Sequence, residues 1–528
     1  MRGAASVVVV GSGAAGLTAA LAAAGAGADV LVLEGAGAVG GTTAMSGGVA
    51  WLPGHGRAPG VCGDDDAGRA LAYLCAAAGG DVDVGLMRAF VSDAGRVAAE
   101  LERRTPLQWE VLAHWPDYRG ELTGASAGGR SLWPRALRLP AAVEARIQPA
   151  LDQPSPAEAT PSARSRAVPA NDGVVLRGHV RGRALVGGLL AAVLDAGAEV
   201  RTRARAGALM VDDGAVTGVV VDGQHHTGRV VLAAGGFQHD AGLVAELLPG
   251  AAVAPMGPPG CAGDAVRMAR AAGAVLGNTA ESWWMPAMAV PGEAVGGTAH
   301  YRPLHGERAQ PGAIMVDATG RRFVDEAQNY GDVGRAMRGA GPGTDAPAPA
   351  PARGTAPWWL VFDAAYRHRY PVGPLDPGGP DPGWLVRGDD LAGLARATGL
   401  PGDALAATVA RFNAGAAIGE DPDFGRGSYP YDRWIGDPGA AHPTLAPITE
   451  APFYALDVHL GCMGTKGGPR TDDRGRVLSA SGRPIAGLYA AGNAAASPFG
   501  TATAAGGATL GPALVFGFRA GEAAAGDR

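Results

Sequence analysis

The stretch that decides the fold is residues 7–16, VVVVGSGAAG, close to the start of the chain. Its four β-branched valines predict a buried strand of a parallel sheet. Gly11, Gly13 and Gly16 follow at the spacing G-x-G-x-x-G, in which the first glycine permits a tight turn and the second lets a pyrophosphate approach the backbone. The third glycine lets the next helix pack closely on the strand. These residues therefore predict a strand, a phosphate-binding turn and the start of a helix.

The residues that follow complete a dinucleotide-binding unit. Residues 17–24 are rich in alanine and leucine and predict a helix whose free N–H groups face the phosphates. Residues 29–34, DVLVLE, predict a second strand that ends in Glu34, placed to accept a hydrogen bond from a ribose hydroxyl. An export signal is the alternative, because residues 3–28 carry no charge and Arg2 precedes them. We favour dinucleotide binding, since an export signal needs neither these glycine spacings nor a following strand and acid.

Length and composition limit the function. The chain has 528 residues, which predicts two or three domains, and 47% of them are hydrophobic, enough for a large core. With 44 basic and 50 acidic residues the net charge is −6, and no basic run is present, so neither nucleic acid nor a membrane surface is an expected partner. The later hydrophobic stretches are too short or too interrupted to span a bilayer. The four scattered cysteines show no metal-ligand spacing, which predicts no metal site, reduced thiols and a cytoplasmic location: Cys62, Cys75, Cys261 and Cys462.

A second glycine-rich segment comes soon after Glu34. Residues 40–48, GGTTAMSGG, offer backbone amides and small hydroxyls that can wrap a pyrophosphate and the edge of a flavin. An ordinary turn is the alternative for this segment taken alone. The residues expected to bind the cofactor here and in the first turn are Gly41, Thr42, Thr43, Ser46, Gly47, Gly48, Ala14 and Ala15.

The middle of the chain predicts further helices and strands. The expected elements are helical structure over residues 64–104 and 182–196, a strand over 198–203 and a hairpin over 206–221. Residues 150–173 are rich in proline, alanine and serine and predict a mobile loop. Residues 229–237, RVVLAAGGF, predict a buried strand that presents Ala234 and Gly235. Asp264 stands near the start of the next helix, where its carboxylate can face a cofactor.

The composition changes at about residue 280. Tryptophan, tyrosine and histidine become more frequent, residues 339–357 predict another linker, and residues 358–363 predict a strand. We interpret residues 281–450 as a second domain, of α+β type, that binds the substrate. It is inserted into a Rossmann-like α/β domain that comprises residues 1–280 and 451–528.

The end of the chain is again rich in glycine. Residues 461–468, GCMGTKGG, predict a turn, and residues 487–493, GLYAAGN, predict a buried strand that ends in Gly492 and Asn493. Residues 500–511, GTATAAGGATLG, lead into a helix over residues 512–524 with Pro512 in its first turn. A helix start of this kind, which includes Thr509 and Leu510, can aim N–H groups and a positive dipole end at the electron-rich edge of a reduced flavin.

Several of these stretches together resemble the fumarate-reductase-type FAD flavoproteins: the opening fingerprint, residues 41–48, residues 233–237 (AAGGF) and residues 487–492 (GLYAAG). Within that superfamily the chain is most similar to the 3-ketosteroid Δ1-dehydrogenases, through residues 321–330 (RRFVDEAQNY), 464–468 (GTKGG) and 507–513 (GATLGPA). The resemblance covers most of the chain, apart from the two proline- and alanine-rich stretches. It implies that the first and last segments hold FAD and that the substrate lies between the flavin and the inserted domain.

The resemblance also implies a reaction. Family members remove two hydrogens from adjacent carbons beside a ketone in a hydrophobic cyclic substrate, and an external acceptor such as a quinone then takes the electrons. By motif, Tyr330 is the base that takes the proton α to the carbonyl, Tyr118 is its assistant, and the N–H of Gly507 holds the ketone oxygen. Residues 500–509 depart from the family's G-H-T-Y-A-G-P-G-A-T, because Thr503 stands where a ketone-binding tyrosine is expected. We therefore expect an altered ketone-binding site and a changed substrate.

Three alternatives remain open at this point. An ene-reductase would use the same flavin with a proton donor and an electron donor, and a flavin-binding protein without turnover would account for Thr503. NAD as the main cofactor fits the fingerprint but leaves residues 464–468 and 500–511 without a function. Among other side chains, Lys466 is expected to make a structural ion pair or to hold its loop, and His300, His305 and His459 are weaker candidates for an acid or base.

Overall fold

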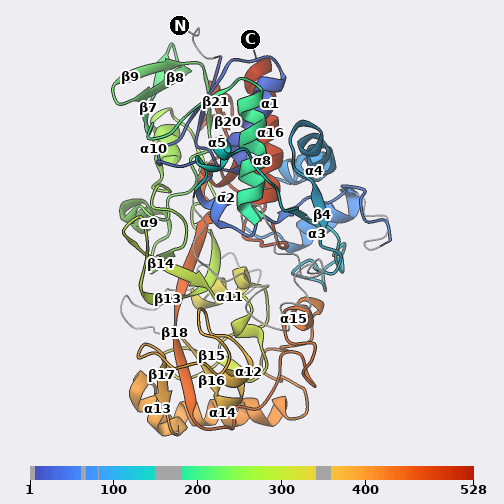
Figure 1. The fold of residues 1–528 in the computed structure, drawn as a ribbon, viewed down its shortest axis with the longest axis vertical. Helices are drawn as coiled ribbons and strands as arrows, with labels where there is room; N and C mark the ends of the chain where they lie inside the picture. Colours follow the sequence, from blue (N-terminus) through green and yellow to red (C-terminus); the bar gives the residue numbers. More distant parts are fainter. Residues whose placement is uncertain (1–5, 61–66, 81, 149–180, 340–357, 528) are drawn as a thin grey trace.

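The structure is a computed structural model that describes residues 6–60, 67–80, 82–148, 181–339 and 358–527. It has two halves arranged along the long axis of the molecule (Figure 1). The loop expected over residues 150–173 lies outside the described residues, as does most of the linker expected over 339–357.

One half is built on a six-stranded sheet in the order β20-β21-β10-β1-β2-β6. The strand β1 (Val7–Val10) lies between β10 (Arg229–Leu232) and β2 (Val30–Leu33) and runs parallel to both. The sheet is completed by β21 (Pro484–Ala490) and β6 (Glu199–Arg201), which are parallel, and β20 (Arg476–Leu478), which is antiparallel. All four residues of β1 are buried, as the uninterrupted valine run predicts for a central parallel strand.

Three helices cover this sheet side by side: α1 (Ala14–Gly25), α8 (Arg181–Asp195) and α16 (Leu510–Gly526) (Figure 1). The helices α1 and α16 pack with their backbones in close approach, since a Cβ added to Gly521 would lie 2.2 Å from the carbonyl oxygen of Ala19. Because these are nearly the first and the last elements of the chain, their contact brings the predicted cofactor segments of both ends together.

The other half contains an antiparallel sheet in the order β14-β13-β18-β16-β15. Its strands are β13 (Ser282–Val295), β14 (Thr298–Pro303), β15 (Ala313–Val316), β16 (Trp358–Asp363) and β18 (Phe453–Thr465), and β18 also pairs with β11 (Ala254–Pro255) and β17 (Val386–Gly388). The accompanying helices are α11 (Tyr330–Met337), α12 (Ala364–Arg369), α13 (Leu391–Thr398), α14 (Gly402–Ala416) and α15 (Pro430–Ile435). The predicted mixed α/β fold is confirmed. The domain boundaries at 280 and 450 stay a prediction, and the central strand β18 comes from the segment after 450.

Smaller elements complete the fold. Two three-stranded sheets are formed by β3 (Ala50–Trp51), β5 (Ser131–Pro134) and β4 (Trp109–Val111), and by β7 (Ala206–Asp212), β8 (Ala215–Val221) and β9 (Gln224–Thr227). The remaining short elements include α2 (Gly41–Met45), α5 (Ala141–Glu144), α9 (Ala241–Leu247), α10 (Asp264–Ala271), β12 (Leu276–Gly277), β19 (Gly468–Pro469) and a 3-10 turn over Glu307–Ala309. Within the described ranges, no helix is long and apolar enough to cross a bilayer.

Two expectations about elements need correction. Residues 461–468 are not a turn, because β18 continues through Thr465 and only Lys466 and Gly467 separate it from β19. The glycines mislead here because they serve close strand packing: a Cβ on Gly461 would lie 2.5 Å from the carbonyl oxygen of Met285. The helical region over 64–104 is two helices, α3 (Ala67–Ala77) and α4 (Val84–Arg104), and Asp83 begins the second by accepting a hydrogen bond from the N–H of Gly85 at 2.7 Å.

Candidate active site

The predicted dinucleotide turn lies at the end of β1. Gly11 has a φ of +105°, and a Cβ added to Gly16 would lie 2.0 Å from the carbonyl oxygen of Gly11. No side chain fits at Gly16, as the close packing of this helix on its strand requires. The N–H of Ser12 donates to the Glu34 carboxylate at 3.1 Å, so the acid at the end of β2 lies beside the turn.

The second glycine-rich segment folds directly against this turn. The N–H of Ala14 donates to Oγ1 of Thr43 at 3.0 Å, and the N–H of Gly40 donates to Oγ of Ser12 at 3.0 Å. The loop after α2 is closed by Ser46, whose Oγ accepts from the N–H of Gly48 at 3.1 Å. The two segments therefore form one continuous surface of backbone amides and small hydroxyls, which suits a pyrophosphate.

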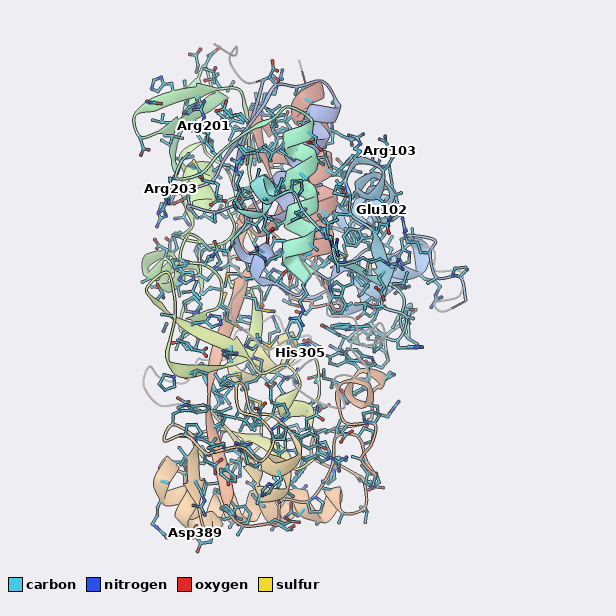
Figure 2. All side chains as sticks on the ribbon, in the orientation of Figure 1. Glu102, Arg103, Arg201, Arg203, His305 and Asp389 are labelled. Atoms are coloured by element: carbon cyan, nitrogen blue, oxygen red, sulfur yellow. The ribbon has the colours of Figure 1, made fainter. Side chains whose placement is uncertain are left out.

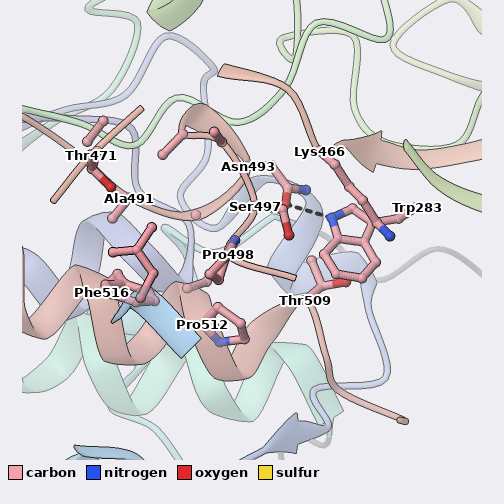
Figure 3. Close-up of a pocket in the computed structure, with 16 residues that line it drawn as sticks. Trp283, Lys466, Thr471, Ala491, Asn493, Ser497, Pro498, Thr509, Pro512 and Phe516 are labelled. Carbon is pink, nitrogen blue, oxygen red and sulfur yellow. Dashed lines mark hydrogen bonds between the residues drawn. The ribbon is translucent and has the colours of Figure 1, made fainter. Parts of the chain in front are cut away.

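The predicted residues near the C-terminus lie next to the same turn. A Cβ on Gly492 would lie 2.9 Å from the Cβ of Ala15, and Asn493 accepts a hydrogen bond from Nε1 of Trp283 at 3.1 Å. Figure 3 shows a pocket between this segment and the start of α16, lined by residues that include Trp283, Lys466, Asn493, Ser497, Thr509 and Phe516. Asn493 and Thr509, both predicted to bind the cofactor, thus share one pocket, and Leu510 is the first residue of α16.

The end of β10 contributes the last predicted cofactor residues. Gly235 has a φ of +79° and lies beside Cys261, and its neighbour Ala234 is half-buried. Asp264 is the first residue of α10, and its carboxylate accepts from Nε of Arg205 at 2.8 Å. Its direct role toward the cofactor stays a prediction, because the structure gives this carboxylate an ion pair with Arg205.

These residues fit an FAD molecule. An ADP moiety needs a glycine turn at the end of a parallel strand and an acid at the end of the next strand. A flavin ring needs a helix start that points towards it, and here that helix comes from the other end of the chain. The converging surfaces come from segments that are almost 500 residues apart in sequence, which a simple NAD domain does not require.

A cluster of tyrosines lies where the two halves meet. Tyr330 is the first residue of α11, and the ring of Tyr118 lies 5.4 Å from it between centroids, nearly perpendicular at 77°. The ring of Tyr431 lies 4.5 Å from that of Tyr118. All three rings are buried, so the resemblance-based pair Tyr330 and Tyr118 is in direct contact and a third tyrosine joins it.

The loop that carries Tyr118 is held by its neighbour Asp117. That buried carboxylate accepts from Nη1 of Arg130 at 2.6 Å, from the N–H of Ser126 at 2.9 Å and from Nε1 of Trp51 at 3.0 Å. Burial, partly offset by Arg130, raises the pKa of Asp117 to about 6. The N–H of Tyr118 itself donates to the carbonyl oxygen of Ala504 at 2.9 Å, which fixes this tyrosine on the predicted ketone-binding segment.

The environment separates the tyrosines by acidity. Burial raises the pKa of all three phenols above the usual value. For Tyr330 the donor hydroxyl of Tyr118 and the charge of Arg308 act in the opposite direction and lower the pKa. For Tyr118 the interaction with Tyr330 raises the pKa further. Of these two tyrosines, Tyr330 is therefore the better base and Tyr118 the better proton donor.

The predicted ketone-binding segment passes over this cluster. A side chain on Gly331 would place its Cβ 2.3 Å from Oγ1 of Thr503, so Thr503 lies against the backbone next to Tyr330. The carbonyl of Gly507 accepts from the N–H of Trp51 at 3.1 Å. The structure thus brings Tyr330, Tyr118 and Thr503 together from three distant parts of the sequence, and Gly507 follows four residues later in the same segment as Thr503.

Lys466 fixes the predicted ketone-binding segment by hydrogen bonds to its backbone. Its buried ammonium group donates to the carbonyl oxygens of Thr501 and Ala502, both at 2.8 Å, and lies 4.3 Å from the ring centroid of Trp283. Burial lowers the pKa of Lys466 to about 7. Of the two expected structural roles, holding the loop agrees with this geometry, and no ion pair of Lys466 is present among the described residues.

Replacing Lys466 by methionine is expected to lower the free energy of unfolding by about 1–3 kcal/mol at neutral pH, because two buried carbonyls lose their donor. A lysine whose pKa is about 7 in the folded state and higher in the unfolded state binds fewer protons when folded. The stability of the wild type relative to Lys466→Met should therefore increase as the pH rises from 7 towards 10. Urea unfolding of both proteins across this range measures the difference, and a constant or falling difference would contradict the assignment.

Sequence reasoning missed three residues of the site. Tyr431 and Trp434 lie on α15, where no recognised motif marks them, and Arg308 lies in the turn over Glu307–Ala309. The aromatic pair Tyr429 and Tyr431 beside Pro430 was the only local signal for α15. Of the weaker candidates, His305 lies in the middle of the molecule (Figure 2), with its ring 5.6 Å from that of Tyr330. His459 is instead partly exposed on β18 and lies 3.3 Å from Asp457.

Comparisons with known proteins identify the family of the chain. Residues 6–510 match the FAD binding domain family. The chain is 38% identical to 4-oxocyclohexanecarboxylate 2-dehydrogenase of Sinomonas cyclohexanicum, covering 99% of this chain and 93% of that protein. It is 33% identical to 3-oxosteroid 1-dehydrogenase of Mycobacterium tuberculosis, covering 97% of each. The crystal structure of 3-ketosteroid delta1-dehydrogenase from Sterolibacterium denitrificans in complex with 1,4-androstadiene-3,17-dione superimposes with a TM-score of 0.88 at 33% identity, covering 99% of this chain and 100% of that one.

The fold and the family match identify a flavin-dependent oxidoreductase of the fumarate-reductase type that acts on CH–CH groups. The chain belongs to the FAD binding domain family, and its relatives of similar length are dehydrogenases of cyclic oxo compounds. It is an FAD-dependent dehydrogenase of a cyclic oxo compound, in agreement with the main prediction from the sequence.

Proposed function

We propose that the substrate is a single-ring ketone of the 4-oxocyclohexanecarboxylate type rather than a steroid. The observation that carries this proposal is an aromatic wall of three residues, Trp115, Tyr431 and Trp434, beside the catalytic tyrosines. The rings of Trp115 and Trp434 lie 4.7 Å apart and those of Tyr431 and Trp434 lie 5.8 Å apart. Trp115 also lies directly on the ketone-binding segment, since a Cβ on Gly506 would be 2.7 Å from its ring. Such a wall favours a compact ring over a long fused system.

The proposed chemistry uses the residues that the tyrosine site brings together. The N–H of Gly507, assisted by the Thr503 hydroxyl, holds the ketone oxygen and stabilises the negative charge that develops on it. Tyr330 takes the proton from the carbon next to the carbonyl, and Tyr118 donates a hydrogen bond to Tyr330. When bound, FAD supplies the acceptor for the hydride from the adjacent carbon. An external electron acceptor such as a quinone and a cytoplasmic location belong to this proposal, and the latter rests on the cysteine spacing.

The substrate class is tested by steady-state turnover with an artificial quinone acceptor. We expect kcat/KM for 4-oxocyclohexanecarboxylate to exceed that for a 3-ketosteroid by at least about tenfold. Fused rings that do not fit the site raise the free energy of the transition state by a few kcal/mol. Trp434→Ala should remove part of the aromatic wall and so lower the ratio of kcat/KM for 4-oxocyclohexanecarboxylate to kcat/KM for the 3-ketosteroid. Trp384→Ala is the matched control, since Trp384 packs in a different apolar cluster. A preference of the wild type for the steroid would overturn the substrate proposal and leave the dehydrogenase function in place.

Restoring an aromatic hydroxyl, as Thr503→Tyr, is expected not to improve turnover on the native substrate. Thr503 is buried against Gly331, so a tyrosine ring has no room there without displacing α11 or the segment over 500–509. The steady-state kcat/KM of Thr503→Tyr with 4-oxocyclohexanecarboxylate checks this expectation. A large gain would show that the missing tyrosine, rather than a changed substrate, limits the site.

A further inference from the structure

Arg308 is completely buried beside the tyrosine cluster, and only part of its guanidinium group is hydrogen-bonded. Its Nε donates to the carbonyl oxygen of Leu304 at 3.1 Å. Its Nη1 donates to the carbonyl oxygen of Gln328 at 2.7 Å and to that of Glu326. Its Nη2 is buried and has no hydrogen-bond partner in the part of the chain that the structure describes. The guanidinium is therefore fixed in place by the segment that leads into Tyr330, with one donor left over.

This arrangement differs from that of the other buried arginines nearby. Arg322 lies 2.7 Å and Arg426 lies 3.1 Å from the Glu326 carboxylate, whereas Arg308 has no carboxylate within 4 Å among the described residues. A buried cation without an anion is costly, and such a charge persists in proteins when another group or the reaction supplies the counter-charge.

The groups that face Arg308 and Tyr330 limit the choice of the missing anion to a phenolate. Burial raises the pKa of Asp325, which interacts with Asp432, and burial also raises the pKa of Glu307, so these carboxyls resist ionisation. Burial and Arg308 lower the pKa of His305 to about 3, so its imidazole is neutral.

The remaining neighbours are Arg426, which is also a cation, and the phenols of Tyr431 and Tyr118, and the charge of Arg308 also acts on the phenol of Tyr330. Arg308 and Tyr118 favour ionisation of both Tyr330 and Tyr431, and of these two phenols Tyr330 is the one with the proposed role of base.

We propose that Arg308 is a positioning residue whose buried guanidinium is the counter-ion of the phenolate that Tyr330 forms before it accepts the substrate proton. The inference rests on the proposed role of Tyr330 as the base. The Tyr330 hydroxyl releases its proton toward solvent, and the guanidinium charge compensates the phenolate. When the substrate C–H bond breaks, its proton restores the phenol, and the cation is again without an anion until the next cycle.

The test compares Arg308→Met and Arg308→Lys in the FAD-loaded enzyme. Two readouts are used: the pH profile of kcat/KM, and an ultraviolet titration of phenolate taken as the difference between each protein and the same protein carrying Tyr330→Phe. Loss of an opposite charge at this range shifts a pKa by about 1–2 units, so Arg308→Met should move the Tyr330 midpoint up and lower kcat/KM at neutral pH by about ten- to a hundredfold. Arg308→Lys keeps the positive charge and should raise the Tyr330 midpoint less than Arg308→Met does.

Arg367→Met is the matched control. Arg367 is also a buried arginine that donates to backbone carbonyls, those of Asp376 and Gly379, but it pairs with Asp381 at 3.1 Å and lies outside the tyrosine cluster. It should leave the Tyr330 midpoint unchanged.

Two results would overturn the inference. Equal losses of kcat in both Arg308 variants with an unmoved pH profile would indicate a purely structural role. A rise in KM for 4-oxocyclohexanecarboxylate but not for cyclohexanone, again without a shift, would indicate that Arg308 binds the substrate carboxylate. If Tyr330→Phe keeps its activity, the proposed base fails, and that outcome is distinct from either result for Arg308.

Discussion

Changing Tyr330 to phenylalanine is expected to lower kcat by about 10²–10⁴-fold, the usual contribution of a general base, while FAD remains bound. Tyr330 lies at the start of α11, in edge-on contact with Tyr118, and the segment that carries Thr503 passes directly over it. Removal of one buried hydroxyl leaves the ring packing intact, so the loss should appear in the chemical step. Stopped-flow reduction of the bound flavin by substrate measures that step directly.

Tyr454→Phe is the matched control for this variant. Tyr454 is also a buried tyrosine with a hydrogen-bonded hydroxyl, which donates to Asp381 at 3.0 Å, but it belongs to another core. It should reduce flavin at the wild-type rate. A Tyr330→Phe enzyme with a rate close to that of the wild type would assign the base to another residue, and Tyr118→Phe would then be the next variant to measure.

Gly16→Val is expected to yield protein that lacks FAD. The Cβ of the new side chain would lie 2.0 Å from the carbonyl oxygen of Gly11, and no shift of a side chain can relieve a contact between two backbone segments. The turn and the start of α1 must move apart, which removes the site for the pyrophosphate. The flavin-to-protein absorbance ratio after purification measures the loss, and overpacking of about 1–3 kcal/mol corresponds to a fall in FAD affinity of about five- to 150-fold.

Gly207→Val serves as the control for this change. Gly207 lies in the strand β7, and no atom lies within 4 Å of the Cβ position. A valine is favourable in a strand, so this variant should keep its full flavin content. Normal flavin content in Gly16→Val would contradict the placement of FAD at the first turn.

The sequence predicted the elements in which local chemistry decides the structure. Local chemistry favours a single structure for the valine run of residues 7–10, for the glycines that follow and for the acid at residue 34. The elements β1, α1 and β2 lie where they were expected. The helix at the C-terminus was predictable for the same reason, through Pro512 and the small residues before it. The contact between α1 and α16 then brings the predicted cofactor residues of both ends together.

The rest of the fold and of the candidate site depends on contacts between residues that are distant in the sequence. Gly461 and Gly464 look like turn residues, but they lie in the central strand β18, because a neighbouring backbone and the side chain of Asn493 leave no space for a Cβ. Tyr118 and Tyr330 could be selected only through the resemblance to known dehydrogenases, since no local pattern distinguishes them from packed aromatic residues. Arg308 had no signal of either kind and Tyr431 had only the aromatic pair beside Pro430, and only the fold brings them to the same site.

The central claim is that the enzyme removes hydrogen from a saturated cyclic ketone and passes it to FAD. The most direct test is an anaerobic titration of the FAD-loaded protein with 4-oxocyclohexanecarboxylate, with the flavin absorbance and the product recorded together. We predict loss of the oxidised flavin band with one equivalent of the conjugated enone formed for each flavin reduced. An unchanged flavin band, with reoxidation of chemically reduced flavin by the enone instead, would contradict this account and assign the reductase direction.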